Sequence, residues 1–329
     1  MRYIIFCFCI LFLTNCKGKD ETFFEEQGKI FHTTYNIKYR YTGSLQKEIE
    51  EALARFDDSL NPFKPTSIIS KVNNNEEVEL DTLFVNVFNR AQEVAFVSDG
   101  MFDITVSPLI NVWGFGFENY ENVSPRVIDS LKRFVGYEKI ELKNGKIVKT
   151  NPHIKINTSA IAKGYATDVI AALLEKHGIK NYMVNIGGEI RSRGYNEKGR
   201  CWRAGITQPV DDGIFDYEHL QTILKVCDRS MATSGDYRKY YIKDGKRYSH
   251  TINPKTGYPA ETNILSATVL ADDCMTADAY ATVFMLTDTA LTRRIAEEKS
   301  LSYMLVMGIS DSSYITVKSK YFDVYVAHD

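Results

Sequence analysis

Apolar residues recur at helical spacing in several segments of the chain. Ile49, Leu53, Phe56 and Leu60 share one face of a predicted helix that ends near residue 60 and that Ser44 can cap. Similar spacing, together with cap residues, predicts further helices that start near Asp81, Ser124, Thr158 or Ser159, Thr276 and Thr289.

Shorter runs that are rich in β-branched and aromatic residues predict strands between these helices. The runs lie at 30–41, 182–186, 202–207, 224–228, 237–242 and 264–270, and further strands close the chain. Strands and helices do not alternate regularly, which favours an α+β fold with mixed or antiparallel sheets packed against helices.

The N-terminal segment has the pattern of a targeting signal. Arg2 precedes an apolar run from Tyr3 to Leu13, which is shorter than the roughly 20 residues that span a bilayer. The following Leu-Thr-Asn-Cys resembles a bacterial lipobox that ends at Cys16. We therefore expect a lipoprotein signal peptide at 1–16, a polar tether at 17–29 and one folded domain at 30–329, anchored by lipid on the periplasmic side of the cell membrane.

Composition and charge exclude some classes of function. The 329 residues carry a net charge of −2 and no basic cluster, so we expect no nucleic-acid partner. Cleavage at the lipobox leaves Cys201, Cys227 and Cys274 in the folded domain, which allows one disulfide at most and leaves the pair open. The sequence has no CxxC motif, which argues against a zinc or iron–sulfur site.

Two oxygen-bearing residues on one predicted helix are candidate metal ligands. Asp278 and Thr282 are four positions apart, so their side chains lie on the same face one turn apart. A carboxylate and a hydroxyl are hard ligands that suit Mg²⁺. The structural alternative is a helix cap at Asp278 and a Thr282 hydroxyl bonded back to a carbonyl.

Three further segments could contact a phosphate-bearing or heterocyclic ligand. The run 157–164 enters a helix, where free N–H groups and Lys163 could receive an anion and Gly164 permits close approach; an ordinary capped helix is the alternative. Asp103 could hydrogen-bond a heterocycle on which Phe102 packs, or could be a turn residue. His250 lies in the polar loop 248–259, where it could be a general base or a surface residue.

Taken together, these blocks resemble the ApbE family, the FAD:protein FMN transferases. The resemblance covers nearly all of residues 30–310. It rests on seven segments in the same order: 61–67 (NPFKPTS), 98–116 (SDGMFDITVSPLINVWGFG), 159–166 (SAIAKGYA), 184–189 (VNIGGE), 233–238 (TSGDYR), 249–259 (SHTINPKTGYP) and 276–282 (TADAYAT).

The resemblance implies a periplasmic enzyme with a T-fold-related architecture. Such an enzyme splits FAD and joins FMN to a Thr or Ser hydroxyl of an acceptor protein, with release of AMP. The acceptors would be subunits of membrane redox or ion-pumping complexes. Rival interpretations are a periplasmic FAD pyrophosphatase and a flavin-binding lipoprotein without catalysis.

The resemblance also implies roles for individual residues. Mg²⁺ would be held by Asp278, Thr282 and the carbonyl of Ala160, with Asp278 and His250 as catalytic residues. The residues that would contact FAD are Phe63, Met101, Phe102, Asp103, Asn157, Lys163, His250 and Ile252.

Three positions depart from the family pattern. Asn253 stands where many members have Asp, so a carboxylate role is lost there. Phe31-His32 replaces Met-Gly at an expected isoalloxazine contact. Phe63 replaces a Tyr, which keeps the stacking face and loses the hydroxyl.

Overall fold

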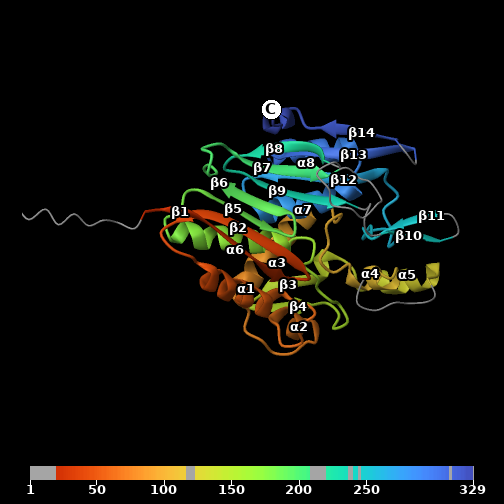
Figure 1. Cartoon of the computed structure of the whole chain (residues 1–329). Coiled ribbons are helices and arrows are strands. Elements are labelled where there is room, and N and C mark those ends of the chain that lie inside the picture. The colour runs from red at the N-terminus through yellow and green to blue at the C-terminus, as the bar shows by residue number, and fades with distance from the viewer. Residues whose placement is uncertain are drawn as a thin grey trace, which may run out of the picture.

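An antiparallel eight-stranded sheet runs through the molecule in the order β1-β2-β5-β6-β9-β12-β13-β14 (Figure 1). The computed structural model describes residues 20–115, 123–207, 220–235, 240–243, 246–310 and 313–328. The strands of this sheet are β1 (Thr22–Ile30), β2 (Thr33–Tyr41), β5 (Tyr182–Ile186), β6 (Glu189–Arg193), β9 (Ser230–Gly235), β12 (Ile264–Ala271), β13 (Ser302–Ser310) and β14 (Ser313–Lys318).

Helices cover one face of this sheet, and the fold is the predicted α+β class. Alternate residues of β12 and β13 point to opposite faces, so Val269 and Leu305 enter the main core with the helices, whereas Leu270 and Val306 face a second cluster. The helices are α1 (Gln46–Leu60), α2 (Ile68–Asn73), α3 (Thr82–Val97), α4 (Ser107–Val112), α5 (Pro125–Lys132), α6 (Ala162–Lys176), α7 (Cys274–Leu286) and α8 (Thr289–Glu298).

Three strand pairs lie outside the large sheet. They are β3 (Ile140–Lys143) with β4 (Lys146–Lys149), β7 (Trp202–Thr207) with β8 (Leu220–Val226), and β10 (Tyr240–Lys243) with β11 (Lys246–Ser249). The β7–β8 pair packs through Trp202 and Leu224 on the sheet face opposite the helices. A disulfide joins Cys201 to Cys227, with Cα atoms 5.1 Å apart, and Cys274 is a buried free thiol.

The best predicted helix is α3. Asp81 caps it by accepting a hydrogen bond from the Phe84 N–H at 2.7 Å. The apolar positions that the spacing placed inward, including Val87 and Val94, are buried in the main core. At α1 the cap prediction for Ser44 is wrong: the N-cap residue is Leu45, without a side-chain cap bond, although the Ser44 hydroxyl accepts from the Gln46 N–H at 3.2 Å.

The tether prediction for 17–29 is wrong over residues 22–29. Those residues form β1, which pairs along its whole length with β2 and lies at an edge of the sheet. Its polar composition is that of an edge strand with one solvated face, which local sequence does not distinguish from a tether. The single strand expected at 30–41 is therefore the end of β1, a turn at Phe31 and His32, and β2.

The start of α6 also differs from the prediction. The helix begins at Ala162, and neither Thr158 nor Ser159 caps it. Instead, the Asn157 side chain accepts hydrogen bonds from both the N–H and the hydroxyl of Ser159, at 2.9 and 2.6 Å. This local turn competes with helix formation and delays the helix by one turn.

A third apolar cluster stands apart from the main core. It joins α4 and α5 to the loop that follows β11, through Leu109, Ile128 and Ile252 among others. In Figure 1, α4 and α5 lie at the end of the molecule remote from the start of β1. In the described part of the chain, no helix has the length and apolarity needed to cross a bilayer.

Candidate functional site

The predicted metal-ligand helix crosses the start of α6 at very short range. The Gly164 N–H donates to Asp278 Oδ2 at 2.9 Å. A Cβ atom at residue 164 would lie 2.3 Å from the Cys274 carbonyl oxygen and 2.7 Å from the Asp278 Cβ. Only glycine permits this approach, which confirms the close contact expected at Gly164 and buries Asp278 against the first turn of α6.

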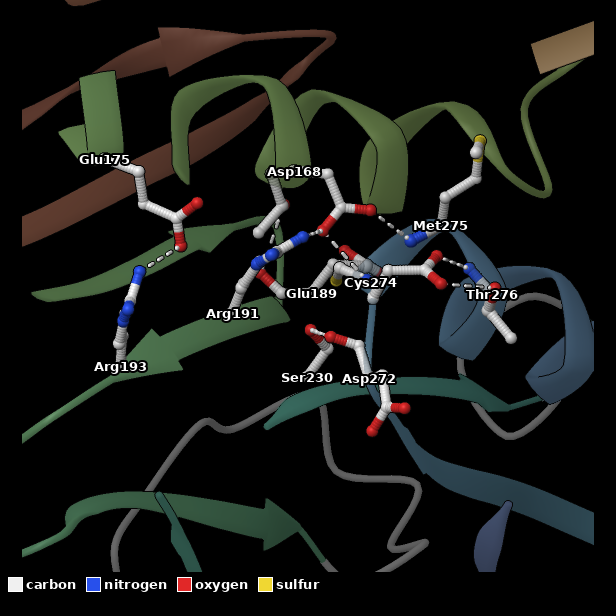
Figure 2. Close-up of polar contacts among 12 residues, drawn as sticks. Asp168, Glu175, Glu189, Arg191, Arg193, Ser230, Asp272, Cys274, Met275 and Thr276 are labelled. Carbon is white, nitrogen blue, oxygen red and sulfur yellow. Dashed lines mark hydrogen bonds and ion pairs between the residues drawn. The ribbon is translucent and has the colours of Figure 1, made fainter. Parts of the chain in front are cut away.

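One turn further along α6, Asp168 fixes the start of α7. Its two carboxylate oxygens accept hydrogen bonds from the backbone N–H groups of Cys274 and Met275, at 2.9 and 2.8 Å (Figure 2). Arg191 on β6 donates to the same carboxylate at 2.7 Å. Burial raises the pKa of Asp168, and these donors oppose that effect. A buried network thus fixes the N-terminal end of the helix that carries Asp278.

Two buried acids share one lysine at this crossing. The Lys163 ammonium pairs with Glu189, whose side chain is only 3% exposed, while a third of the Lys163 side chain reaches solvent. Burial raises the pKa of Glu189 to about 7; Lys163 opposes this rise and Asp278 adds to it. Burial also raises the pKa of Asp278. Burial lowers the pKa of Lys163, but attraction to both acids outweighs it and the net shift is upward.

This charge balance fits a bound cation. Two carboxylates face one ammonium, and Glu189 Oε2 is buried without a hydrogen-bond partner among the described residues. Thr282 lies one turn beyond Asp278 on α7, and its hydroxyl is 3.2 Å from that of Ser234. Ala160 lies in the turn that leads into α6. The carboxylate, hydroxyl and carbonyl of this set are all hard oxygen donors, as Mg²⁺ requires.

The candidate ligands Asp278, Thr282 and Ala160 differ from a metal centre built of several acids or histidines. Within the described ranges, no three His, Cys, Asp or Glu residues group closely enough to hold a metal ion. The helix-cap alternative for Asp278 fails, because Asp273 is the residue that caps α7 and Asp278 is internal to the helix. The Asp236–Arg238 part of one motif lies outside the described residues.

The candidate FAD contacts fall into different environments. Phe63 is 59% exposed, and its ring centroid lies 5.2 Å from that of His32, so an aromatic face is open to solvent there. Asn157 is joined to the segment of Asp103 by a 2.7 Å bond from its N–H to the Ile104 carbonyl. These two motifs, distant in sequence, therefore lie side by side.

Some of the candidates also have a clear structural role. Asp103 Oδ1 accepts from the Thr105 N–H at 2.7 Å, as expected of a turn residue. Burial raises the pKa of the Asp103 carboxyl. Phe102 is 2% exposed and lies in the main core, while Met101 beside it is half-buried. The roles of these three residues toward FAD remain predictions.

The loop of His250 is closed on itself and packs on the third cluster. His250 is half-buried, with the Phe115 ring centroid 6.4 Å away, and Ile252 is buried. Asn253 Oδ1 accepts from the N–H groups of Lys255 and Thr256, at 2.9 and 3.2 Å. An amide oxygen performs this turn-forming role as well as a carboxylate does, so the departure at 253 keeps the loop structure.

Sequence reasoning missed the importance of Glu189 and Asp168. A local signal for a site at Glu189 was present. This acid follows a predicted buried strand and two glycines, which places a charged residue at the end of a strand. Asp168 gave no local signal, because its partners Arg191, Cys274 and Met275 are all distant in sequence.

The fold and site define an α+β protein in which a buried acid pair and a lysine lie where two helices cross. The sequence model of the ApbE family matches residues 31–305. The chain is 35% identical to the FAD:protein FMN transferase of Vibrio cholerae serotype O1 over 92% of each chain, and 34% identical to that of Haemophilus influenzae over 95% of this chain and 94% of the relative.

Solved structures agree with these relatives. The flavin transferase ApbE from Vibrio cholerae superposes with a TM-score of 0.82 at 33% identity, covering 93% of this chain and 99% of that one. The apo flavinyl transferase ApbE of Pseudomonas stutzeri gives a TM-score of 0.82 at 26% identity, with 93% and 97% coverage. The chain belongs to the ApbE family, as its motifs indicated.

Proposed function

We propose that this protein transfers FMN from FAD to a Thr or Ser hydroxyl of an acceptor protein and releases AMP. The observation that carries the proposal is the pair of buried acids, Glu189 and Asp278, with the partly exposed Lys163 at the α6–α7 crossing, in a chain that matches named FMN transferases over nearly all its length. Excess buried negative charge beside a helix start suits a cation that in turn binds phosphates.

In this reaction the acceptor oxygen attacks the FMN phosphorus and the bond from that phosphorus to the AMP oxygen breaks. Mg²⁺, held by Asp278, Thr282 and the Ala160 carbonyl, would neutralise negative charge on the pyrophosphate. Lys163 adds a positive charge at the same helix start. His250 is the candidate base that takes the proton of the attacking hydroxyl.

The proposed location is the periplasmic side of the cell membrane, with Cys16 as the lipid-anchored residue. The Cys201–Cys227 disulfide supports a compartment outside the cytoplasm, since such bonds persist under oxidising conditions. The proposed acceptors are subunits of membrane redox or ion-pumping complexes, which the enzyme would meet at that surface.

The test combines the purified chain with FAD, Mg²⁺ and an acceptor domain that carries a flavinylation motif. Intact mass of the acceptor and released AMP are measured together, with and without EDTA. We expect a mass increase equal to covalent FMN that EDTA abolishes. Release of AMP and free FMN with no modified acceptor would favour the pyrophosphatase, and bound FAD without AMP would leave a binding protein.

A further inference from the structure

The loop that carries His250 is a closed unit whose placement depends on contacts outside it. Within the loop, the Ala260 N–H donates to the Thr251 carbonyl and the Gly257 N–H donates to the Asn253 carbonyl, both at 2.8 Å. Ile252 and Pro259 form a β-bridge. A loop closed in this way moves as one piece, so a contact at its tip also sets the position of its base.

Trp113, at the end of α4, makes a buried contact at that tip. Its indole Nε1–H donates to the Gly257 carbonyl at 2.8 Å, and its ring centroid lies 5.6 Å from that of Tyr258. Gly257 has φ +81°, and a Cβ there would lie 2.5 Å from Ile128 Cγ2 on α5. The loop backbone is therefore pressed against α5, and its carbonyl is directed to the indole.

The same short segment also reaches the other end of the loop. Phe115 follows Trp113 by two positions, and its ring centroid is 6.4 Å from that of His250. A second external contact, between Lys255 and Asp99, is between exposed side chains, of which Asp99 is 84% exposed. Exposed ion pairs contribute little, whereas a buried carbonyl deprived of its donor is costly.

We propose that Trp113 is a positioning residue for the transfer reaction, which acts by holding the loop so that His250 meets the acceptor hydroxyl. This inference rests on the proposed function and on the role of His250 in it. It requires no contact between Trp113 and FAD. Its effect should fall on turnover, because misplacement of a base by about 1 Å can cost about 100-fold in rate.

The first test is Trp113→Phe, which keeps an aromatic ring and removes the Nε1–H donor. We expect kcat for FMN transfer to fall about 10-fold or more, with the dissociation constant for FAD nearly unchanged. The matched control is Ile128→Val, which trims the same apolar cluster and leaves the hydrogen bond. This control should lower the melting temperature slightly, and at temperatures below the melting transition its kcat should be unchanged.

Two outcomes of this test overturn the inference. One is a Trp113→Phe enzyme with the wild-type kcat. The other is an Ile128→Val enzyme whose kcat falls as much as that of Trp113→Phe, because any loosening of the apolar cluster would then explain the loss of turnover. Circular dichroism gives the folded fraction, and kcat is expressed per folded molecule. Should Trp113→Phe not fold, Trp113→His keeps a ring N–H and should retain more turnover than Trp113→Leu.

A double-mutant cycle tests whether Trp113 acts through His250. In a His250→Ala background, we expect Trp113→Phe to cause no further loss of the residual turnover. If the two substitutions instead reduce turnover by independent factors that multiply, Trp113 does not act through His250. Full activity of His250→Ala alone would overturn the inference as well. Failure of the proposed function is distinguishable, because the wild-type chain would then modify no acceptor.

Discussion

Gly164 and Asp278 join the two central helices through a 2.9 Å hydrogen bond from the backbone of one to the carboxylate of the other. The bond aligns a buried acid with the start of α6, and the missing Cβ makes the bond possible. Metal and phosphate chemistry proposed for this protein both depend on that alignment.

Gly164→Ala should therefore destabilise the protein and reduce its activity together. The added methyl group meets backbone and Cβ atoms within 3 Å, so α6 and α7 must separate. We expect a loss of about 2 kcal/mol or more in the free energy of unfolding, measured by urea denaturation. Gly43→Ala is the control, because nothing lies within 4 Å of a Cβ there; equal effects of the two changes would contradict this account.

Asp278→Asn should separate stability from turnover. The amide keeps the shape of the carboxylate and removes one of two buried like charges, so the melting temperature in EDTA should stay the same or rise. Turnover with FAD and Mg²⁺ should fall about 100-fold or more, because the amide is a poor ligand for the cation.

The control for this substitution is Asp288→Asn, which changes an acid of the same type at the cap of α8. Asn caps a helix as well as Asp does, so both stability and turnover should be kept. Wild-type turnover by Asp278→Asn would remove the assignment of the metal to this residue.

Elements with local signals were predictable from the sequence. The start of α3 combines a cap residue, Asp81, with clear helical spacing, and both act within a few residues. The start of α6 was misplaced because Asn157 competes for the same backbone groups. The strand β1 was missed because pairing with β2, a tertiary contact, decides the conformation of a polar segment.

The candidate site likewise has a part that local sequence predicts and a part that only the folded chain brings together. Asp278 and Thr282 could be found from their spacing on one helix. The Lys163–Glu189 pair and its burial depend on a strand and a helix that meet only in the folded chain. Charge balance in a buried site is a sum over such distant partners, so the sequence alone could not provide it.

Glu189 should make stability depend on pH near neutrality. Its pKa is about 7 in the folded protein against 4.5 when unfolded, so the folded state binds the proton more tightly. The stabilisation is present in full below pH 4.5 and is lost as pH rises through about 7. In EDTA, the melting temperature of the wild type should fall over this range more steeply than that of Glu189→Gln. Parallel curves would show that Glu189 does not titrate there.

Cys16→Ala tests the proposed lipid anchor. Without the thiol no lipid can be attached, and we expect the protein to leave the membrane fraction on ultracentrifugation. Cys9→Ala is the matched control, because Cys9 lies in the apolar run that would be removed with the signal peptide. Continued sedimentation of Cys16→Ala with membranes, at wild-type levels, would refute the anchor.

Removal of the Cys201–Cys227 disulfide should lower stability without affecting the chemistry. The bond joins the ends of the β7–β8 pair across a sequence separation of 26, and closure of such a loop contributes about 3 kcal/mol. The pair packs on the sheet face opposite the helices, away from Asp278. The double variant Cys201→Ser/Cys227→Ser should thus lose about 3 kcal/mol of unfolding free energy and keep its kcat at 25 °C. Dithiothreitol should destabilise the wild type by a similar amount and leave the double variant unchanged. A shift of equal size in both proteins would assign the effect to something other than this bond.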